Sequence, residues 1–462
     1  MKVKFMNFKS GIRILVLVSA FLLQSSCMDN SMVRNEEIKI KVGAAAEEIM
    51  SDDSMDIAGG IQPWKAKGQE APIRATAVVI EGGEIKLCIV SCDVINVNRD
   101  YLDDLMKKIE TELGIPFSNI LISATHTHHA PATGKSHVAE RNEIFVNNLK
   151  DAIFKAVAKA NEKLKTAPYS SMYFWLGQEA TVGQNSRLLL SDSTIFWVGS
   201  REDAIRPTGT FDPDLPVIAF KSGNEKLEAL IFNHSTHNIG AREGGVRSPA
   251  FYGLAAQDLE QELDGTCLFM LGACGSVHAL GLSGEERAFR IREAVKDAYY
   301  KAQIRPVFRL VSVKEEFKYQ IRTFNEAEEE KAVTYYCTKR GSGNPGPTIA
   351  AFRARRAELA PHQGETMKTW LQVMQIGDVA IVAVSGEFFN ELGLEIKRRS
   401  PFRYTYIVEL ANDNIGYIPD KKGFKLGGYQ VWTGAHSRVA EGTGEAIVVE
   451  AIQILSKLYN NQ

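Results

Sequence analysis

Three of the nine histidines of this chain fall within four positions, in the stretch SATHTHHAPATG at residues 123–134. In an extended segment side chains alternate between faces, so His126 and His128 share one face and His129 points to the other. Adjacent cationic imidazoles repel each other, whereas a metal ion that holds neutral ring nitrogens removes this conflict. The spacing therefore indicates a metal site, with a polar surface loop that carries incidental histidines as the alternative.

Polar residues also follow three other apolar runs. LEALIFNHSTHN holds His234 and His237, whose spacing of three does not put both on one strand face. We expect His234, the nearer to the strand, to face the site, although a structural, hydrogen-bonded histidine is the alternative. GACGSVHA carries His278 among glycines that allow close backbone approach. In VAVSGEFFNELG, the Glu387 carboxylate either caps a helix or completes a metal site.

The elements that must position these residues alternate along the chain. Strand-like runs such as TAVVIEG, KLCIVSC and CLFMLGA alternate with helix-like segments such as DYLDDLMKKIETELG and EERAFRIREAVKDAYYKA. Tight turns within VIAFKSGNEKLEALIF and QIGDVAIVAV predict antiparallel hairpins. We therefore predict an α/β fold, a layered sandwich of mixed sheets flanked by helices, as a single large domain over residues 61–462. The polar residues then lie at the downstream ends of strands, where α/β proteins usually place their sites.

The composition excludes some classes of function. The chain of 462 residues is 45% hydrophobic and 24% charged, which supports a large core, and its net charge is only −2. It has no lysine-arginine run interleaved with aromatic residues, so we do not expect a nucleic acid partner. If Cys27 is set aside, the remaining five cysteines are an odd number, which excludes a full disulfide framework and favours small buried hydrophobic residues.

The N-terminal 27 residues are typical of an export signal. Four basic residues precede the apolar run ILVLVSAFLL, which is too short to span a bilayer. The run ends at QSSC, and its Cys27 is similar to the lipidated cysteine of bacterial lipoprotein signals, with simple cleavage and release as the alternative. We expect an exported protein, either anchored in the membrane as a lipoprotein or free in the periplasm or outside the cell. Residues 28–60 are predicted to form a linker and the first strand.

These blocks, in this order, resemble the catalytic domain of the neutral/alkaline non-lysosomal ceramidases. SATHTHHAPATG is similar to that family's SATHTH block, FNHSTHN to its Phe-x-x-His-Gly-Thr block, SGEFFNELG to its Pro-Gly-Glu-Phe strand end, and NDNIGYIPDKKGFKLGGYQ to its tyrosine-rich segment. The resemblance covers residues from about 70 to the C-terminus. It does not extend to the family's additional C-terminal sandwich domain, which we expect to be absent.

The resemblance implies one zinc ion held by two imidazoles, a carboxylate and a phenolate, a donor set that suits zinc but also permits manganese or iron. The implied ligands are His126, His234, Glu387 and Tyr417. It further implies that His128 lies beside the metal as a partner for substrate or water. Arg187 in GQNSRLLL would contact substrate, although the family places its arginine directly after the asparagine and Ser186 intervenes here.

The chain departs from the family at its serine block. The family has Gly-Asp-Val-Ser-Pro, whereas residues 275–279 read GSVHA, so His278 stands at the serine position. Water activated by zinc needs no serine. We therefore predict a zinc-dependent hydrolase that cleaves an amide of a ceramidase-like N-acyl substrate, a small molecule or sphingolipid, with His128 and His278 as catalytic groups that move protons. The alternatives are an esterase or deacylase that acts on carbohydrate or envelope substituents, and a non-catalytic, metal-containing binding relative.

Overall fold

The computed structural model describes residues 36–461 apart from 138, 280 and 342. The predicted export segment, with Cys27, lies outside the described residues. In the part of the chain that the structure describes, no helix is both long and apolar enough to cross a bilayer. The five cysteines found there are buried and free, as expected.

A nine-stranded mixed sheet forms the larger half of the core. Its order is β13-β12-β11-β7-β1-β4-β5-β6, with the short β15 paired to β7. The pairs β5–β6 and β12–β13 are parallel, and the other pairs are antiparallel. The strands are β1 (Ile40–Glu48), β4 (Arg74–Gly82), β5 (Ile85–Cys92), β6 (Ile120–Ala124), β7 (Tyr169–Gln178), β11 (Asp214–Ser222), β12 (Leu227–His234), β13 (Thr266–Leu271) and β15 (Gln303–Arg305). The strand expected within residues 28–60 is thus β1, an inner strand of this sheet.

A smaller sheet packs face to face against the first one. It has the order β16-β17-β18-β20, formed by β16 (Leu310–Gln320), β17 (Thr366–Ile376), β18 (Val379–Val384) and β20 (Tyr404–Val408). Apolar side chains of both sheets, such as Phe220 and Ile381, share one buried cluster between them. The hairpins predicted at VIAFKSGNEKLEALIF and QIGDVAIVAV are β11–β12 and β17–β18.

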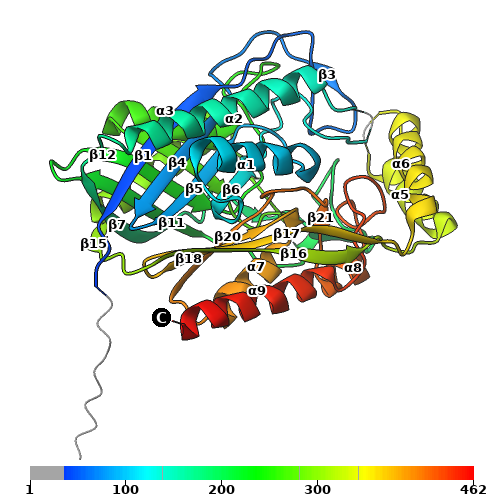
Figure 1. Ribbon diagram of the computed structural model, residues 1–462. Helices are drawn as coiled ribbons and strands as arrows, with labels where there is room; N and C mark the ends of the chain where they lie inside the picture. The colour runs from blue at the N-terminus through cyan, green and yellow to red at the C-terminus, as the bar shows by residue number, and fades with distance from the viewer. Residues whose placement is uncertain (1–35, 138, 280, 342, 462) are drawn as a thin grey trace, which may run out of the picture. The chain divides into compact units, whose positions relative to one another are not determined.

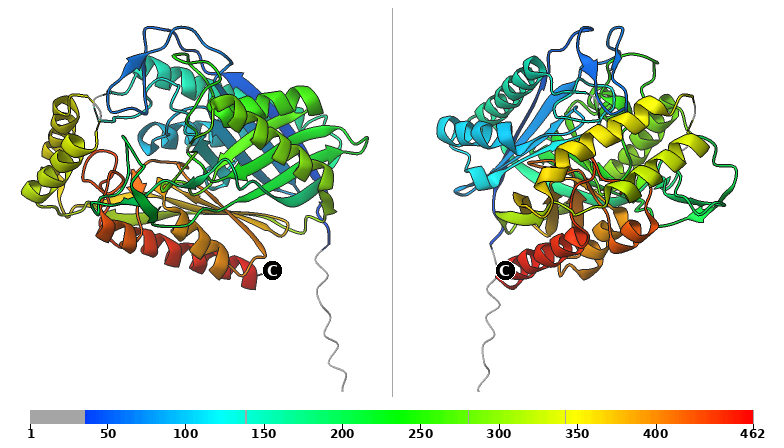
Figure 2. Two further views of the ribbon diagram at one scale, coloured as in Figure 1. Left: turned by 180° about the vertical axis from the view of Figure 1, so that it is seen from behind. Right: turned by 90° about the vertical axis from the view of Figure 1, so that its right-hand side faces the viewer.

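Helices cover the outer faces of both sheets. The larger sheet is covered by α1 (Arg99–Leu113), α2 (Glu143–Lys163), α3 (Ala250–Leu263) and α4 (Gly284–Lys301), and the smaller sheet by α7 (Asn390–Arg399) and α9 (Thr443–Asn460) (Figures 1 and 2). The order helix, sheet, sheet, helix confirms the predicted layered α/β architecture. A hairpin of α5 (Glu326–Lys339) and α6 (Gly346–Leu359) stands at the side of the sheets.

The remaining elements are short. Four two-stranded ladders pair β2 (Asp56–Ile57) with β3 (Trp64–Lys65), β8 (Gln184–Asn185) with β14 (Val277–His278), β9 (Leu188–Leu190) with β10 (Ala204–Pro207), and β19 (Glu387–Phe388) with β21 (Tyr417–Ile418). One helical turn and a half form α8 (Lys421–Leu426), and 3₁₀ turns lie at Phe117–Asn119 and Ala360–His362. Two of these ladders, β8–β14 and β19–β21, carry residues of the site.

The segment after β20 joins the two edge strands of the larger sheet. The Glu409 N–H donates to the Leu271 carbonyl at the end of β13 (2.9 Å), and the Asn412 N–H donates to Ile122 in β6 (2.7 Å). The sheet is therefore curled so that β6 and β13, the ends of its strand order, both lie beside residues 409–412. This closure brings the loops that follow β6, β12 and β13 to one place.

Candidate metal centre

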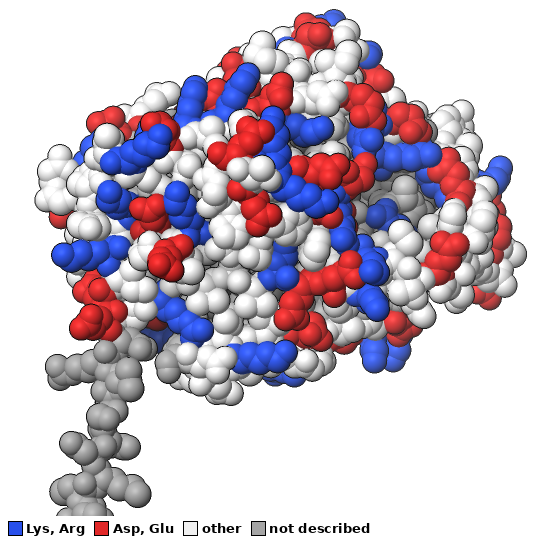
Figure 3. Space-filling view, in the orientation of Figure 1, with Lys and Arg blue, Asp and Glu red and all other residues white. Residues whose placement is uncertain are grey.

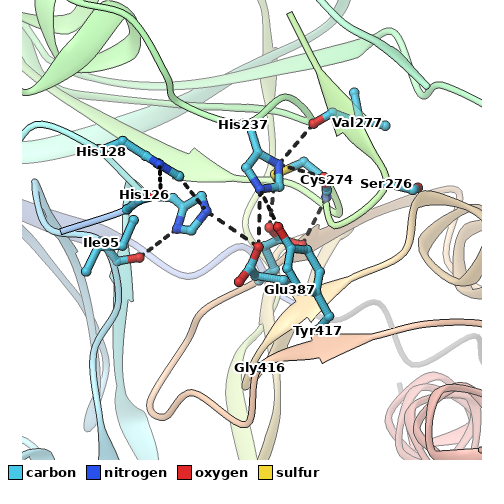
Figure 4. A network of polar contacts seen from close by, with 12 residues as sticks. Ile95, His126, His128, His237, Cys274, Ser276, Val277, Glu387, Gly416 and Tyr417 are labelled. Atoms are coloured by element: carbon cyan, nitrogen blue, oxygen red, sulfur yellow. Dashed lines mark hydrogen bonds and ion pairs between the residues drawn. The ribbon is translucent and has the colours of Figure 1, made fainter. Parts of the chain in front are cut away.

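His126 and His128 converge directly after β6. Their Nε2 atoms lie 3.2 Å apart and their rings meet edge to face, with centroids 4.7 Å apart (Figure 4). The backbone that brings them together is not the extended segment expected from the alternation of side chains. The strand ends at Ala124, and His126 has a φ of +62°, a left-handed conformation that few residues other than glycine adopt. Such a conformation costs free energy, and residues that adopt it cluster at functional sites.

His237, Glu387 and Tyr417 complete the group. His237 Nε2 lies 3.2 Å from both Glu387 Oε2 and the Tyr417 hydroxyl, and Glu387 Oε2 lies 3.6 Å from His126 Nε2 (Figure 4). Glu387 and Tyr417 stand opposite each other in the β19–β21 ladder, so two distant sequence blocks supply neighbouring side chains. Potential ligand atoms of His126, His128 and His237 all lie within 4.8 Å of one another.

His234, the expected ligand of the second block, does not join this group. Its Nδ1 faces the Tyr252 hydroxyl at 2.5 Å, and its Nε2 donates to the Glu179 carbonyl at 2.9 Å, so both ring nitrogens are occupied in the core. The choice of His234 over His237 is therefore wrong. His234 is the last residue of β12 and points into the packed layer, whereas His237 lies three residues past the strand, where the chain is free to turn toward the cluster.

The hydrogen bonds of the three clustered rings fix their tautomers. A backbone carbonyl can only accept, so an Nδ1 that faces one carries the proton and leaves the Nε2 lone pair bare. The Nδ1 atoms of His126, His128 and His237 face the carbonyls of Ile95, Gly59 and Cys274 at 2.7, 3.1 and 2.9 Å. Gly59 adopts a φ of +101°, and a side chain there would collide with the His128 ring.

Burial keeps the imidazoles of His126 and His128 neutral. It lowers the pKa of His126 to about 4 against the opposing charge of Glu387, and it lowers the pKa of His128 well below the usual range, with help from His126. Burial alone would raise the pKa of Glu387, but His126 and His237 outweigh it and lower the pKa. The burial of Tyr417, followed by the charge of Glu387, raises the pKa of its phenol well above the ordinary value.

The donor set fits a divalent metal ion. Three bare imidazole lone pairs and a carboxylate oxygen face one another, an arrangement of acceptors that is repulsive until a cation stands among them. Each imidazole is oriented by a carbonyl behind it, the usual second hydrogen bond of a metal-binding histidine. Imidazole nitrogens with carboxylate and phenol oxygens are ligands that zinc accepts readily. The ligand roles of His126, Glu387 and Tyr417 stay predictions that this geometry favours.

Comparison with known proteins finds similar structures but no similar sequence. No protein-family model and no curated protein sequence matches the chain. A crystal structure of neutral ceramidase from Pseudomonas aeruginosa superposes with a TM-score of 0.70 at 17% identity, over 91% of this chain and 75% of the other. The chain has the fold of a neutral ceramidase. A ceramidase complexed with C2 is similar to the same degree, with a TM-score of 0.70 at 17% identity over 92% and 76% of the two chains.

The serine block, where the chain departs from the ceramidase pattern, lies beside the cluster. His278 stacks on His237 with ring centroids 3.9 Å apart and an interplanar angle of 17°. Ser276 lies away from the cluster (Figure 4). Its Oγ accepts from the Asn390 N–H (3.1 Å) and lies 3.4 Å from Glu391 Oε2. His278 therefore contacts the cluster, whereas Ser276 hydrogen-bonds the start of α7.

Arg187, the substrate contact expected from the ceramidase resemblance, does not line the site. Its side chain is 1% exposed, and its guanidinium donates to Gln430 Oε1 (2.8 Å) and to the carbonyls of Gly427 (2.6 Å) and Gly423 (3.2 Å). Burial lowers the pKa of Arg187 to about 10. This corrects the expected substrate contact, because the guanidinium hydrogen-bonds α8 and the loop that follows it.

A cavity of about 80 Å³ opens beside the cluster. His126, His128, Glu387 and Tyr417 form one side of it. Its other side includes His137, Tyr429 and His436. The rings of His137 and His436 lie 4.5 Å apart, although the residues are 299 positions apart in the chain, and no local sequence pattern indicates this contact.

Proposed function

We propose that this chain is a metal-dependent hydrolase that cleaves an amide bond of an N-acyl substrate with water as the nucleophile. The observation that carries the proposal is the convergence of three bare Nε2 lone pairs, from His126, His128 and His237, beside the Glu387 carboxylate. The ceramidase fold supports the same reaction class, since the chain superposes on neutral ceramidase over most of its length. The adjoining cavity gives a substrate access to the centre.

A zinc ion bound there would supply an activated water near neutral pH and polarise the substrate carbonyl. The residues of the chain do the rest. Ile95, Gly59 and Cys274 hold the imidazoles in one tautomer through their carbonyls. Glu387 supplies the negative charge of the centre, and Tyr417 places a hydroxyl 3.2 Å from His237.

Proton movement is assigned to His128 and His278. In the overall reaction water adds to the carbonyl carbon, the C–N bond breaks, and the products are a carboxylate and an amine that has gained a proton. His128 Nε2 lies within reach of the same point as the ligand atoms, so it either joins the ligand set or accepts the proton of the water. We assign to His278, which stacks on His237, the donation of a proton to the leaving amine.

The test is a measurement of zinc content together with amide hydrolysis. Protein dialysed against chelator and then titrated with zinc should bind one ion per chain and gain hydrolysis of N-acyl amines in proportion to bound zinc. His126→Ala should lose both properties, while His362→Ala, which changes an exposed histidine in a 3₁₀ turn, should keep both. Zinc binding without hydrolysis of amides or esters would support the non-catalytic alternative and overturn the proposed activity.

We also propose that residues 1–27 direct export and that Cys27 carries a lipid. The support is the sequence alone, four basic residues followed by an apolar run that ends at QSSC. Mass spectrometry of the protein from its native membrane should find an acylated N-terminal Cys27. A mature chain that begins elsewhere without lipid would contradict the anchor.

A further inference from the structure

The walls of the site cavity and of its mouth are mixed in polarity and contain few aliphatic side chains. Four lining side chains of the 80 Å³ cavity are aliphatic: Ala58, Ile95, Leu410 and Ala435. Beyond the clustered ligands, the rest are glycines and the side chains of asparagine, lysine, serine, histidine and tyrosine residues. Pockets that accept drug-sized apolar ligands are usually about 300–1,000 Å³ in volume and mostly apolar. This cavity has room for a small acyl group but none for a long alkyl chain.

A charged cleft adjoins the cavity. Gly134, Lys135 and Asn414 line both the cavity and a cleft of about 820 Å³ that opens beside the start of α1. Twelve of the seventeen residues that line this cleft are charged, six of each sign, and Met367 is its one aliphatic side chain. Figure 3 shows the surface hollowed between α1 and the α5–α6 hairpin, with lysine and arginine side chains around the hollow. Whatever part of a substrate extends from the cavity therefore lies against charged groups.

Hydrogen-bonding atoms at the cavity lack partners. Ser136 Oγ, His137 Nδ1 and His436 Nδ1 are buried without a hydrogen-bond partner in the described part of the chain, and all three residues line the cavity. His137 is 4% exposed. A buried polar atom without a partner costs about 1–3 kcal/mol, so three of them around one small cavity indicate an occupant that supplies hydrogen bonds, either ordered water or a ligand whose polar groups replace it.

From these three observations we infer that the substrate is a short-chain amide of a hydroxyl-rich amine, with the chemistry of an N-acetylated amino sugar, and not a long-chain N-acyl lipid. The inference rests on the proposed amide hydrolysis for the reaction itself. The short acyl group fits the small cavity at the metal centre. The hydroxyl groups pair with Ser136, His137 and His436, and the remainder of a larger saccharide extends along the charged cleft. A long alkyl chain in the same place would gain none of the roughly 0.8 kcal/mol that burial of each methylene contributes.

The test compares four amides on the zinc-loaded full chain: the N-acetyl and N-hexadecanoyl derivatives of glucosamine and of sphingosine, all in the same detergent. We expect kcat/KM for N-acetylglucosamine to exceed that for N-acetylsphingosine by at least 10-fold and that for either hexadecanoyl amide by at least 100-fold. If N-hexadecanoylsphingosine is cleaved as fast as N-acetylglucosamine, the inference is overturned, while the proposed amide hydrolysis stands.

A binding measurement tests the inferred ligand class independently of the proposed hydrolysis. Calorimetry should detect N-acetylglucosamine binding that Ser136→Ala weakens by about 2- to 10-fold, the loss of one hydrogen bond. Ser170→Ala is the matched control, because Ser170 Oγ in β7 is also buried without a partner but does not line the cavity. Binding of the sugar amide with no cleavage of any of the four amides would uphold the ligand class and overturn the proposed reaction. The absence of both binding and cleavage would overturn both.

Discussion

Glu387 Oε2 lies 3.2 Å from His237 Nε2, although the two residues are 150 positions apart in the chain. His237 is fixed from behind, since its Nδ1 donates to the Cys274 and Val277 carbonyls. The pair therefore directs an imidazole lone pair and a carboxylate oxygen to one point. The composition of the proposed metal centre therefore depends on His237, and not His234, being the histidine of this segment that faces the cluster.

Replacement of His237 should remove the metal, and replacement of His234 should not. We expect His237→Ala to weaken zinc binding by at least 100-fold, because it deletes a proposed ligand. His234→Ala should keep its zinc affinity within about threefold and lose roughly 1–3 kcal/mol of unfolding free energy, since it leaves the Tyr252 hydroxyl and the Glu179 carbonyl without a partner in the core. Competition with a chromophoric chelator and urea unfolding measure the two effects. The reverse pattern would restore His234 as the ligand.

His278→Ala should separate proton transfer from metal binding. The ring stacks on His237 and does not belong to the group of three imidazoles, so we expect kcat to fall about 100-fold while zinc affinity changes little. His362→Ala serves as the exposed control. The kcat and the zinc dissociation constant are to be measured on the same preparations. An unchanged kcat would remove His278 from the reaction.

Arg187→Ala should affect stability and leave substrate binding unchanged. The guanidinium makes three buried hydrogen bonds to Gln430, Gly423 and Gly427, and hydrogen bonds to charged groups contribute about 1.5–3 kcal/mol each. We expect a loss of at least about 3 kcal/mol in the free energy of unfolding, with the KM of the folded fraction unchanged. A large rise in KM at unchanged stability would instead support the substrate contact that the family resemblance implied.

Lys314 should make stability depend on pH. It lies in β16 between the two sheets, where its Nζ donates to the Ile120 carbonyl (2.6 Å), and burial lowers its pKa to about 7. Between about pH 7 and 10.5 the unfolded chain holds a proton on this lysine that the folded chain has lost, so stability rises with pH over this range. Relative to Lys314→Met, the unfolding free energy should increase by about 2–4 kcal/mol from pH 7 to 10. Parallel pH profiles of the two proteins in urea unfolding would show that the lysine is not titrating there.

The sequence predicted the layers of the fold because apolar periodicity and turn residues are local signals. The hairpins at residues 217–232 and 371–384 lie where their turns indicated. The curl of the larger sheet was not predictable from such signals. It depends on residues 409–412 pairing with Leu271 and Ile122, contacts that join strands more than 100 residues away in the chain.

The same limit explains the errors at the site. The spacing of His126 and His128 predicts a pair, although their convergence depends on a left-handed backbone at His126 for which the sequence carries no local signal. Proximity to an apolar run favours His234 over His237, but the orientation of each side chain depends on where the strand ends. The motif around Arg187 implies a substrate contact, yet the partners of its guanidinium lie more than 200 residues further along the chain. Orientation past the end of a strand is set by tertiary contacts, which local patterns do not encode.

X-ray absorption at the zinc edge of the metal-loaded protein tests the central claim most directly. The account predicts one zinc ion per chain, surrounded only by nitrogen and oxygen, with the multiple-scattering signature of imidazoles at about 2.0–2.1 Å. Three imidazoles are expected if His128 joins the ligand set and two if it serves as the proton acceptor, and His237→Ala should remove one in either case. A spectrum without imidazole scattering, a sulfur ligand, or a ligand shell that His237→Ala leaves unchanged would contradict it.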